Sequence, residues 1–313
     1  MQELYKQLKT FGHVKLNEPL AKHTTFKIGG AADFFIEIND NEKLVALLNF
    51  VSGVGVDYFI LGGGSNMLFS DDGFKGVVIK VKTIDYRLLT TDTIVADAGV
   101  LLSQIVSFAA KNSLSGLEWG VGIPGTVGGA VRGNAGAMGQ ETANCLEKVE
   151  MWQNGEIMEM TKEELKFSYR SSCIKSSGGV ILKAFFKLVP AEKQTIMIAM
   201  TGYLKQRTGR YPAFPSAGSF FQNIDINKWP GDLKALPEIF VERKKVPVGW
   251  VVEQLNLKGF AVGGAKISDE HGNFVINYNH ATQADILTLI ETLKEKVYNK
   301  FGVELIPEVE IIN

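Results

Sequence analysis

Glycine is so concentrated in the middle of this chain that it limits what the segment can form. More than a third of the positions from Gly116 to Gly139 are glycine. Each glycine in a helix interior costs about 1 kcal/mol relative to alanine, so a long helix is disfavoured here. Glycine also tolerates positive φ and lets backbone N–H groups approach a ligand closely. Because the flanking segments are strongly apolar, the cluster predicts binding loops made by backbone rather than disorder.

The segment Gly120–Gly125 (GVGIPG) matches the G-x-G-x-x-G pattern of dinucleotide-binding folds. That pattern has to follow a strand and open a long helix that packs on the sheet. Here Pro124 lies inside the motif, and it is followed closely by Gly128, Gly129, Gly133, Gly136 and Gly139. We therefore interpret the segment as a loop and not as a Rossmann fingerprint.

A second glycine loop, Gly62–Asn66 (GGGSN), follows a short apolar segment that is predicted to be a strand. Its consecutive N–H groups can form an anion-binding nest, and Ser65 and Asn66 add side-chain hydrogen bonds. The later block contributes Thr126 and Asn134 as polar groups. Two such loops can hold a pyrophosphate and the polar edge of a large ring. The alternative is that both loops are tight turns only.

Composition excludes several classes of protein. The chain is 45% hydrophobic and 21% charged, which is close to the globular average, and its net charge is −1. Neither nucleic acid nor an anionic membrane is favoured by that balance. No uncharged apolar run approaches the roughly 20 residues that span a bilayer. Cys145, Cys173 and the four histidines lack metal-ligand or disulfide spacing, so we expect two buried, reduced thiols and no metal.

The spacing of apolar residues predicts an α+β chain. Helices are expected at residues 40–52, 101–112, 192–207, 248–255 and 282–301, and strands at 56–61, 76–81, 147–152, 180–188 and 274–277. The last helix should start at a capping box formed by Thr282 and Asp285 and stop at Gly302. The sequence changes character near residue 195, so we expect domains at 1–195 and 196–302, followed by a terminal strand at 303–313.

Seven segments, in order, resemble one enzyme family. They are HTTFKIGG (23–30), LGGGSN (61–66), GIPGTVGGAVRGNAGA (122–137), FSYRSS (167–172), PSAGSFFQN (215–223), GWVVEQLNLKGFAVGGA (249–265) and IPEVEI (306–311). Together they span nearly the whole chain, and the joint pattern resembles UDP-N-acetylenolpyruvoylglucosamine reductases. The resemblance implies a two-lobed FAD-binding domain of the vanillyl-alcohol-oxidase (PCMH) type, followed by a smaller α/β substrate-binding domain.

The resemblance also implies an activity and its partners. Enzymes of this family use NADPH to reduce non-covalently bound FAD, which then reduces the enolpyruvyl ether of a UDP-sugar to give UDP-N-acetylmuramate. This is a step of peptidoglycan synthesis, and so of cell-wall biogenesis, cell shape and cell division. We accordingly expect a soluble cytoplasmic flavoprotein oxidoreductase with a UDP-sugar substrate. Nucleic acid, membrane insertion and an obligate protein partner are not expected.

The site residues follow from the resemblance, position by position. Arg170, Ser219 and Glu308 match the family's active-site arginine, serine proton donor and C-terminal glutamate. Asn223, Gln254 and Arg210 fall where the family contacts substrate, although many members have lysine at the position of Arg210. The expected cofactor-binding residues are Gly62, Gly63, Gly64, Ser65, Asn66, Pro124, Gly125, Thr126, Gly129, Asn134, Ala135 and Gly136. The segment between Arg170 and Ser219 is short, which resembles the shorter subclass that lacks a loop carrying a tyrosine.

The chemistry explains why these residue types are needed. Adding hydride to C3 of an enolpyruvyl group builds negative charge at C2 and in the carboxylate. A fixed guanidinium stabilises that charge and can bind two oxygens at once, which suits Arg170. The developing carbanion is a strong base, so a weakly acidic hydroxyl such as that of Ser219 can protonate it. Glu308 either polarises the intermediate or orients the donor.

Two other readings remain open from the sequence. The first is another flavin oxidoreductase of the same fold, acting on a sugar or a hydroxy acid. Some of those enzymes attach flavin covalently through a histidine in the first glycine loop, which is absent from Gly62–Asn66. The second is a nucleotide-sugar binding protein without activity, against which the joint presence of Arg170, Ser219 and Glu308 argues.

Overall fold

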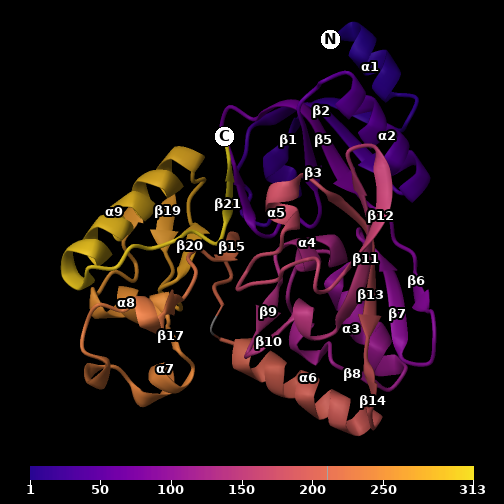
Figure 1. Cartoon of the computed structure of the whole chain (residues 1–313). Coiled ribbons are helices and arrows are strands. Elements are labelled where there is room, and N and C mark those ends of the chain that lie inside the picture. The colour runs from indigo at the N-terminus through magenta and orange to yellow at the C-terminus, as the bar shows by residue number, and fades with distance from the viewer. Residues whose placement is uncertain (210) are drawn as a thin grey trace. The chain divides into compact units, whose positions relative to one another are not determined.

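The chain divides into two compact units, each with its own hydrophobic core (Figure 1). The structure is a computed structural model that describes residues 1–209 and 211–313. Unit 1 contains Met1–Glu18, Ala32–Gly63 and Lys75–Arg207, and unit 2 contains Pro19–Ala31, Gly64–Phe74 and Thr208–Asn313. The expected boundary near residue 195 falls inside a helix, and two short N-terminal stretches belong to unit 2. The division is therefore not contiguous along the sequence.

Unit 1 is built largely on two sheets. The first has the strand order β1 (Val14–Pro19), β2 (Ala31–Ile38), β5 (Phe74–Val81) and β3 (Tyr58–Leu61), and β3 pairs with β5 in parallel. Helix α2 (Asn41–Gly53) connects β2 to β3. Its N-cap is Asp40, whose carboxylate accepts a hydrogen bond from the Lys43 N–H at 2.8 Å. Parallel neighbours need a crossover of about a dozen residues, and between β3 and β5 that crossover is residues 62–73, which contain the short strand β4 (Met67–Phe69) and no helix.

The second sheet of unit 1 is antiparallel in every pair. Its order is β12 (Glu156–Thr161), β11 (Leu146–Gln153), β13 (Val180–Lys187), β7 (Thr93–Asp97) and β6 (Tyr86–Leu88). Two smaller ladders are β8 (Leu114–Ser115) with β14 (Val189–Pro190), and β9 (Gly136–Ala137) with β10 (Gln140–Glu141). The ladder of β9 and β10 lies at the end of the glycine-rich segment and gives its last residues a defined backbone.

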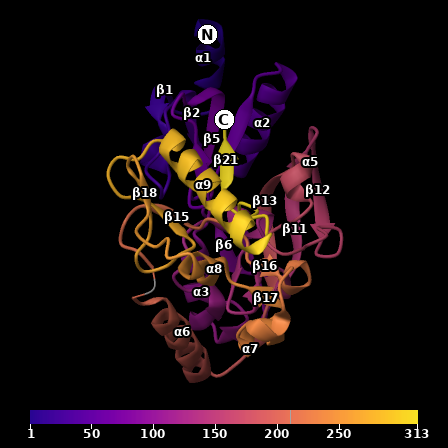
Figure 2. The ribbon, with the colours of Figure 1, turned by 90° about the vertical axis from the view of Figure 1, so that its left-hand side faces the viewer.

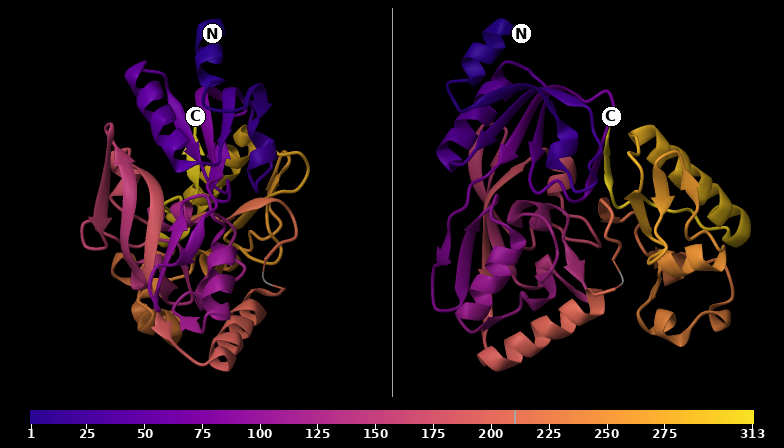
Figure 3. Two further views of the ribbon diagram at one scale, coloured as in Figure 1. Left: turned by 90° about the vertical axis from the view of Figure 1, so that its right-hand side faces the viewer. Right: turned by 180° about the vertical axis from the view of Figure 1, so that it is seen from behind.

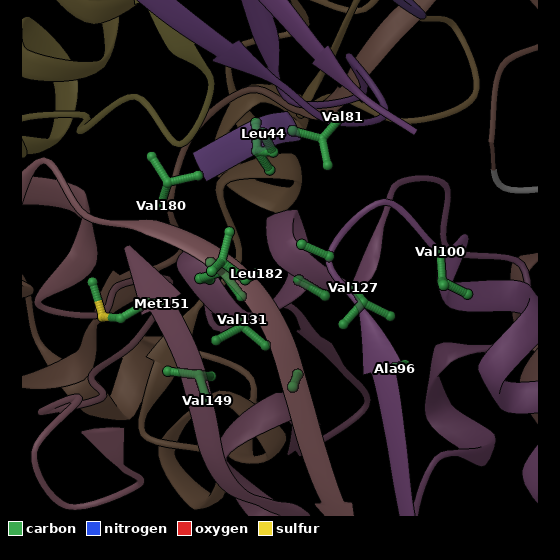
Figure 4. Close-up of a cluster of buried hydrophobic side chains, with 14 of the residues drawn as sticks. Leu44, Val81, Ala96, Val100, Val127, Val131, Val149, Met151, Val180 and Leu182 are labelled. Atoms are coloured by element: carbon green, nitrogen blue, oxygen red, sulfur yellow. The ribbon is translucent and has the colours of Figure 1, made fainter. Parts of the chain in front are cut away.

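The glycine-rich segment is anchored by apolar side chains of α4 (Val127–Arg132). Val127 and Val131 of this short helix are fully buried. Figure 4 shows them facing Val149 and Leu182 of the antiparallel sheet. Burying a side chain of this size stabilises the folded state by roughly 1.5–3 kcal/mol. The valines between the glycines therefore fix the segment to the core, while the glycines shape its backbone.

Three further helices complete unit 1, together with α5 (Ile174–Ser177). They are α1 (Gln2–Leu8), α3 (Leu102–Lys111) and α6 (Lys193–Arg207). Helices α3 and α6 contact each other, and Figure 3 shows them close together. Short 3₁₀ turns of the chain lie at Leu20–His23, Glu118–Gly120, Thr142–Asn144, Ile226–Lys228 and Leu233–Ala235.

Unit 2 is a smaller α/β arrangement. Its main sheet has the order β15 (Ser216–Ser219), β20 (Phe274–Asn277), β19 (Ala265–Ile267) and β18 (Ala261–Val262). Strand β16 (Ile224–Asp225) pairs with β17 (Lys245–Val246), and α7 (Glu238–Glu242) and α8 (Val248–Gln254) lie beside them in sequence. Strand β4 (Met67–Phe69) pairs in parallel with β21 (Glu310–Ile312), the last strand of the chain.

Helix α9 (Gln283–Phe301) packs on β18 and β19, and Figure 2 shows its length. Five apolar residues on one face of α9 are buried: Ile286, Leu289, Ile290, Leu293 and Val297. The expected capping box is present, because the Thr282 hydroxyl accepts a hydrogen bond from the Asp285 N–H and the Asp285 carboxylate accepts one from the Thr282 N–H. Gly302 ends the helix at φ +67°. The start, apolar face and end of this helix were all predicted from sequence.

Across the described ranges, 1–209 and 211–313, no helix combines the length and apolar character needed to cross a membrane. Within the same residues, no group of three or more His, Cys, Asp and Glu side chains is arranged to hold a metal ion.

Candidate active site

The two glycine loops meet in unit 1 through backbone. An added Cβ at Gly63 would lie 2.6 Å from the Gly125 Cα, and one at Gly62 would lie 2.7 Å from the Thr126 Oγ1. Both distances are far below van der Waals contact; at Gly63 the neighbour is backbone, so no side chain fits there, whereas at Gly62 the Thr126 side chain would have to move. Gly125 also has φ +123°, a conformation that other residues avoid. The loops are well separated in the sequence, and the fold brings them together.

Thr126 serves the local fold at this junction. It is the N-cap of α4, and its hydroxyl accepts a hydrogen bond from the Gly129 N–H at 3.4 Å. The helix that follows has only six residues. A dinucleotide fingerprint requires a long helix at this point. The interpretation of Gly120–Gly125 as a loop rather than a Rossmann motif therefore agrees with the structure.

Asn134 is placed differently from our expectation. Its side chain has no exposed surface, and its amide is used inside unit 1. The amide nitrogen donates to the Ser168 carbonyl at 3.0 Å, and the amide oxygen accepts from the Ala143 N–H at 3.1 Å. The expectation of Asn134 as a polar group offered to the cofactor is therefore corrected. A side chain this enclosed links segments of the protein instead.

The remaining residues of the later block follow Asn134. The Ala135 N–H donates to the Ala130 carbonyl at 2.8 Å, which continues the turn after α4. Gly136 lies in β9, where an added Cβ would be 2.4 Å from the Gln140 carbonyl oxygen. Pro124 lies between Gly120 and Gly125, in the loop that leads to Gly125. All these residues belong to unit 1.

The second half of the first glycine loop belongs to unit 2. Gly64 has φ +65°, and its carbonyl accepts a hydrogen bond from the Thr25 N–H at 2.9 Å. Ser65 follows it, and Asn66 then contacts the C-terminal strand. The Asn66 side-chain amide donates to the Glu308 carbonyl at 3.1 Å, and the Asn66 carbonyl accepts from the Glu310 N–H at 3.1 Å. The loop thus leads directly to the segment that carries Glu308.

Arg170 lies in a strained tight turn of unit 1. Ser168 and Ser171 form an isolated antiparallel bridge, with N–H to carbonyl distances of 3.0 and 3.1 Å. Tyr169 and Arg170 make the turn, and Arg170 has φ +57°. A positive φ at the third position is the requirement of a type II turn, where glycine is preferred. An arginine there costs about 1–2 kcal/mol, and such strain often marks a functional position.

The Arg170 side chain is directed to the glycine-rich segment. One guanidinium nitrogen, Nη2, donates to the Gly136 carbonyl at 2.7 Å. The guanidinium carbon also lies 4.9 Å from the centre of the Tyr169 ring, a cation–π contact. A guanidinium has five N–H donors, so it can bond the Gly136 carbonyl and a second acceptor at the same time.

Ser219 ends β15 and lines a pocket of unit 2. Gly218 before it has φ +82°, and Ser219 pairs with Phe274 of β20. The pocket has a volume of about 200 Å³, and its lining includes Ser219, Asn223, Trp250, Glu253, His271 and Asn273. Ser219 is therefore part of the wall of a polar cavity.

The backbone of Glu308 lies beside the backbone that follows Ser219. The Glu308 N–H donates to the Phe220 carbonyl at 2.8 Å, and Phe221 forms a bridge with Pro307. Phe220 and Phe221 are both buried, so the chain after Ser219 is held firmly. The fold of unit 2 thus brings together two of the three expected catalytic residues, which are far apart in sequence. Arg170 belongs to unit 1.

The three expected substrate-binding residues have different positions. Asn223 lines the same pocket as Ser219, and its amide oxygen accepts a hydrogen bond from the Val248 N–H at 3.3 Å. Gln254 ends α8 and is exposed, and its carbonyl accepts from the Lys300 ammonium at 2.9 Å. Arg210 lies outside the described residues.

Two parts of the chain match known protein families. Residues 210–312 match the family described as the C-terminal domain of UDP-N-acetylenolpyruvoylglucosamine reductase, and residues 32–161 match an FAD binding domain. The reductase of Carboxydothermus hydrogenoformans is 39% identical over 316 residues, with 99% of this chain and 97% of that protein covered. The reductase of Caldanaerobacter subterraneus is 37% identical over 309 residues, covering 98% and 96%.

The chain belongs to the UDP-N-acetylenolpyruvoylglucosamine reductase family. A solved member, the enzyme of Thermus caldophilus, has a TM-score of 0.78 with 32% identity, over 96% of this chain and 99% of that one. The expected fold class, an FAD-binding domain followed by a substrate domain, is confirmed.

The glycine loops fit the FAD that this family implies. The matched FAD binding domain, residues 32–161, contains both Gly62–Asn66 and Gly122–Gly136. At Gly63 the packed loops leave no room for a Cβ, so backbone N–H groups are the main donors that this junction can offer. Backbone donors in tight glycine turns are the common way to bind a pyrophosphate.

Asn273, His271 and Trp250 are among the residues of the serine pocket that were not predicted from the sequence. Asn273 bonds the Phe221 backbone from both ends of its amide, at 3.0 and 2.8 Å. His271 accepts the Asn273 N–H on Nδ1 at 3.1 Å, and Trp250 packs against Phe240 edge to face. Pairing of β15 with β20 places Asn273 and His271 beside Ser219. Periodicity predicts strand 274–277 but not its partner, so the sequence carried no signal for this neighbourhood.

Neither cysteine has the features of a catalytic nucleophile. Burial raises the pKa of the Cys145 thiol to about 12, so it stays protonated at neutral pH. Cys173 is only half-buried, which differs from the expectation of two buried thiols. It donates through Sγ to the Glu164 carbonyl.

Proposed function

We propose that this chain uses NADPH and FAD to reduce UDP-N-acetylglucosamine-enolpyruvate to UDP-N-acetylmuramate, in the cytoplasm, as a step of peptidoglycan synthesis. The observation that carries the proposal is the position of Ser219. Ser219 lines a polar pocket, and the carbonyl of Phe220 beside it accepts a hydrogen bond from the Glu308 N–H. Family membership along nearly the full chain supports the same reaction.

FAD is held non-covalently by the two glycine loops in this proposal. The residues assigned to it are Gly62, Gly63, Gly64, Ser65, Asn66, Pro124, Gly125, Thr126, Gly129, Ala135 and Gly136. When bound, FAD takes hydride from NADPH and supplies it to C3 of the enolpyruvyl group. Cofactor binding is assigned to the N-terminal part of the chain, substrate binding to residues 196–302, and residues 303–313 carry Glu308.

Arg170 stabilises the negative charge that develops on the enolpyruvyl carboxylate. Its guanidinium is already held by the Gly136 carbonyl and the Tyr169 ring, so little reorganisation is needed when charge appears. Donors that are fixed before the reaction are worth more than mobile ones. Lysine at this position keeps the charge but loses the planar fork of donors.

Ser219 donates the proton to C2 of the substrate. A serine hydroxyl is a weak acid, and it is adequate here because the carbanion at C2 is a strong base. The backbone of Glu308 is hydrogen-bonded to Phe220, the residue after Ser219. In this proposal Glu308 either polarises the intermediate or orients the proton donor. Asn223, Gln254 and Arg210 contact the UDP-sugar. The chain further belongs to the shorter subclass without the tyrosine loop, an assignment supported by the short segment between Arg170 and Ser219.

Absorbance spectroscopy of the purified protein tests the proposal. We expect the flavin bands, release of the colour into the supernatant on acid precipitation, bleaching by NADPH and return of the bands on adding the enolpyruvyl UDP-sugar. The control is UDP-N-acetylglucosamine, which lacks the enolpyruvyl group and should leave the bleached flavin unchanged.

Two experimental outcomes would contradict the proposal. Colour that stays with the acid-precipitated protein would overturn non-covalent binding. Bleached flavin that the enolpyruvyl sugar does not reoxidise under anaerobic conditions would overturn the proposed substrate.

A further inference from the structure

The turn of Arg170 is held from two sides by side chains that bond its backbone. The Ser168 carbonyl accepts the Asn134 amide at 3.0 Å, in addition to the Ser171 N–H of the turn itself. On the other side, the Lys175 ammonium donates to the Arg170 carbonyl at 2.8 Å. Both carbonyl groups that flank the strained residues are therefore fixed by donors from outside the turn.

We infer that Asn134 and Lys175 are positioning residues for Arg170. They hold the Ser168–Ser171 turn in the conformation that directs the guanidinium to the Gly136 carbonyl. The inference rests on the proposed role of Arg170 and assigns to Asn134 a purpose other than cofactor contact.

Asparagine meets three requirements at position 134. The backbone there has φ +43°, a region in which asparagine is several-fold enriched over most residues. The site needs a donor toward the Ser168 carbonyl and an acceptor toward the Ala143 N–H at once. An amide supplies both, whereas an ionised carboxylate only accepts. Asn134 is fully buried, so bulk water does not compete with its side chain for these bonds.

Asn134 also links the turn to the segment that Arg170 reaches. The Arg170 guanidinium donates to Gly136, two residues after Asn134, and the Ser172 hydroxyl donates to the Arg132 carbonyl at 2.8 Å, two residues before it. Hydrogen bonds thus join the turn to the glycine-rich segment at every second residue, at positions 132, 134 and 136. Losing the central bond leaves the strained turn free to relax, and the guanidinium then moves with it.

Two substitutions at position 134 separate positioning from packing. Asn134→Asp keeps the size, the acceptor and the tolerance of positive φ, but it turns a carboxylate oxygen toward the Ser168 carbonyl. Asn134→Gly keeps the backbone conformation and removes both bonds. If Asn134 acts only by packing, Asn134→Asp should be reoxidised at the wild-type rate. If the N–H donor of its amide is required, both variants should be reoxidised slowly.

The measurement is stopped-flow absorbance of the FAD-loaded protein in two steps. Both Asn134 variants should reoxidise with the enolpyruvyl sugar about 10–100-fold more slowly, the loss typical of a displaced electrostatic donor. Flavin affinity and bleaching by NADPH should stay within about threefold, because neither depends on the Arg170 guanidinium in the proposed reaction. In the flavin-free protein, hydrogen exchange at the Ser171 N–H should also rise.

Thr142→Val is the matched control. The Thr142 hydroxyl is equally buried in the same segment and donates to the Ala130 and Ala135 carbonyls, away from the Arg170 turn. Its loss should change both steps to a similar, small extent. Selective slowing of reoxidation by Thr142→Val would show that any damage to this segment has that effect, and would overturn the inference.

If the Asn134 variants fail to fold, Lys175→Met tests the positioning role independently. Lys175 is exposed, so its loss leaves the core intact. We expect reoxidation about 3–10-fold slower, since one charge-assisted hydrogen bond is lost, and recovery with Lys175→Arg. The control is Lys166→Met, an exposed lysine shortly before Arg170 in the chain. Equal rates for Lys175→Met and Lys166→Met would overturn the inference.

Arg170→Ala separates this inference from the proposed function. Slow reoxidation in Arg170→Ala together with normal rates in the Asn134 and Lys175 variants would reject the positioning role alone. A normal rate in Arg170→Ala would reject the role of Arg170 in the proposed function.

Discussion

Ser219 has a backbone that is fixed on both sides and a side chain that is left accessible. It pairs with Phe274, the Phe220 N–H after it donates to the Asn273 carbonyl at 2.7 Å, and Phe220 is buried. A proton donor gains from such rigidity, because the transfer needs a short, aligned approach to the carbon that receives the proton. The same rigidity allows a side-chain substitution here to leave the fold undisturbed.

We predict that Ser219→Ala separates the two steps of the reaction. Bleaching by NADPH needs no proton at C2 and should be nearly unchanged. Reoxidation by the enolpyruvyl sugar should slow by about 10²-fold or more, the usual loss of a positioned acid. The change in stability should stay within about 1 kcal/mol. Stopped-flow absorbance of each step is the measurement.

Ser216→Ala is a suitable control for Ser219→Ala. Ser216 begins the same strand, and its hydroxyl accepts a long hydrogen bond from the Gly218 N–H at 3.5 Å. Both steps should keep wild-type rates in this variant. Equal slowing of both steps in Ser219→Ala would mean that Ser219 supports the flavin site, and no slowing would move the proton donor elsewhere, with Glu308 next.

At the scale of single residues, motif resemblance led us to expect Arg170, Ser219 and Glu308 in the active site, but it did not indicate the residues that hold them. Asn134 was expected to contact the cofactor because it is a polar residue in the second glycine block. Its side chain instead donates to the Ser168 carbonyl, 34 residues away in the sequence. No local sequence pattern predicts that hydrogen bond. Lys175 and Asn273 were missed for the same reason.

The packed glycine loops are the element to which we assign cofactor binding. Gly63 faces the Gly125 backbone and not a flexible side chain, so an added methyl group can be accommodated only if the loops separate. Each loop alone is an ordinary turn. Their contact brings two sets of N–H groups to one place.

We predict that Gly63→Ala lowers flavin affinity and thermal stability together. The new Cβ would lie 2.6 Å from the Gly125 Cα, and overpacking of this kind typically costs about 1–3 kcal/mol. The control is Gly202→Ala in α6, where an added Cβ meets nothing within 4 Å. That change should stabilise the protein by roughly 0.5–1 kcal/mol, because glycine is unfavourable inside a helix. Flavin titration and thermal melts would be compared; wild-type flavin affinity in Gly63→Ala would contradict the prediction.

The start of α9 should carry a pH dependence. Hydrogen bonds from the Thr282 N–H and then the Gly264 N–H lower the pKa of Asp285. A lowered folded-state pKa means stabilisation that is complete above the unfolded pKa and lost as pH falls through the folded value. Asp285→Asn should cost about 0.5–1 kcal/mol at pH 7, the usual size of a cap. The difference from wild type should shrink below about pH 4, where free Asp titrates. Urea unfolding at several pH values measures it, and a constant difference would contradict it.

Regular elements were predictable wherever the local sequence decides them. The expected strand at 274–277 is present with those bounds, and the helices expected at 101–112 and 282–301 run from Leu102 to Lys111 and from Gln283 to Phe301. Their caps and apolar faces lie in adjacent residues. The pairing of β4 with β21 was not predictable, because it joins residues 67–69 to residues 310–312. Short ladders such as β9 with β10 were missed because each strand has two residues.

Over the whole molecule, the two thiols report on opening of the fold. The pKa of Cys145 is raised to about 12 by burial, so at pH 8 only about one thiol in ten thousand is ionised there. A disulfide reagent should therefore react rapidly with at most one thiol per native chain, that of Cys173, and with two in denaturant. Two rapid thiols in the native protein would contradict the burial of Cys145, and Cys173→Ser identifies which thiol reacts.

The boundary expected near residue 195 does not coincide with the division of the chain into compact units. A composition change near residue 195 suggested a single cut, but α6 continues to Arg207 and belongs to unit 1. Residues 19–31 and 64–74 then join unit 2 although they are surrounded in sequence by unit 1. A linear scan finds only boundaries at which composition changes once, so a unit made of separate stretches escapes it.

The separate stretches of unit 2 give the chain an order of assembly during synthesis. Every residue of unit 1 has been made once Arg207 is added, whereas β4 has to wait for β21, the last strand of the chain. Ribosomes add about 5–20 residues per second, so the wait is roughly 10–50 s. Throughout that interval, Met67–Phe69 lacks its partner strand, although the segments before and after it in the sequence belong to unit 1. Residues 310–312 therefore complete the pairing of a strand that the ribosome made more than 200 residues earlier.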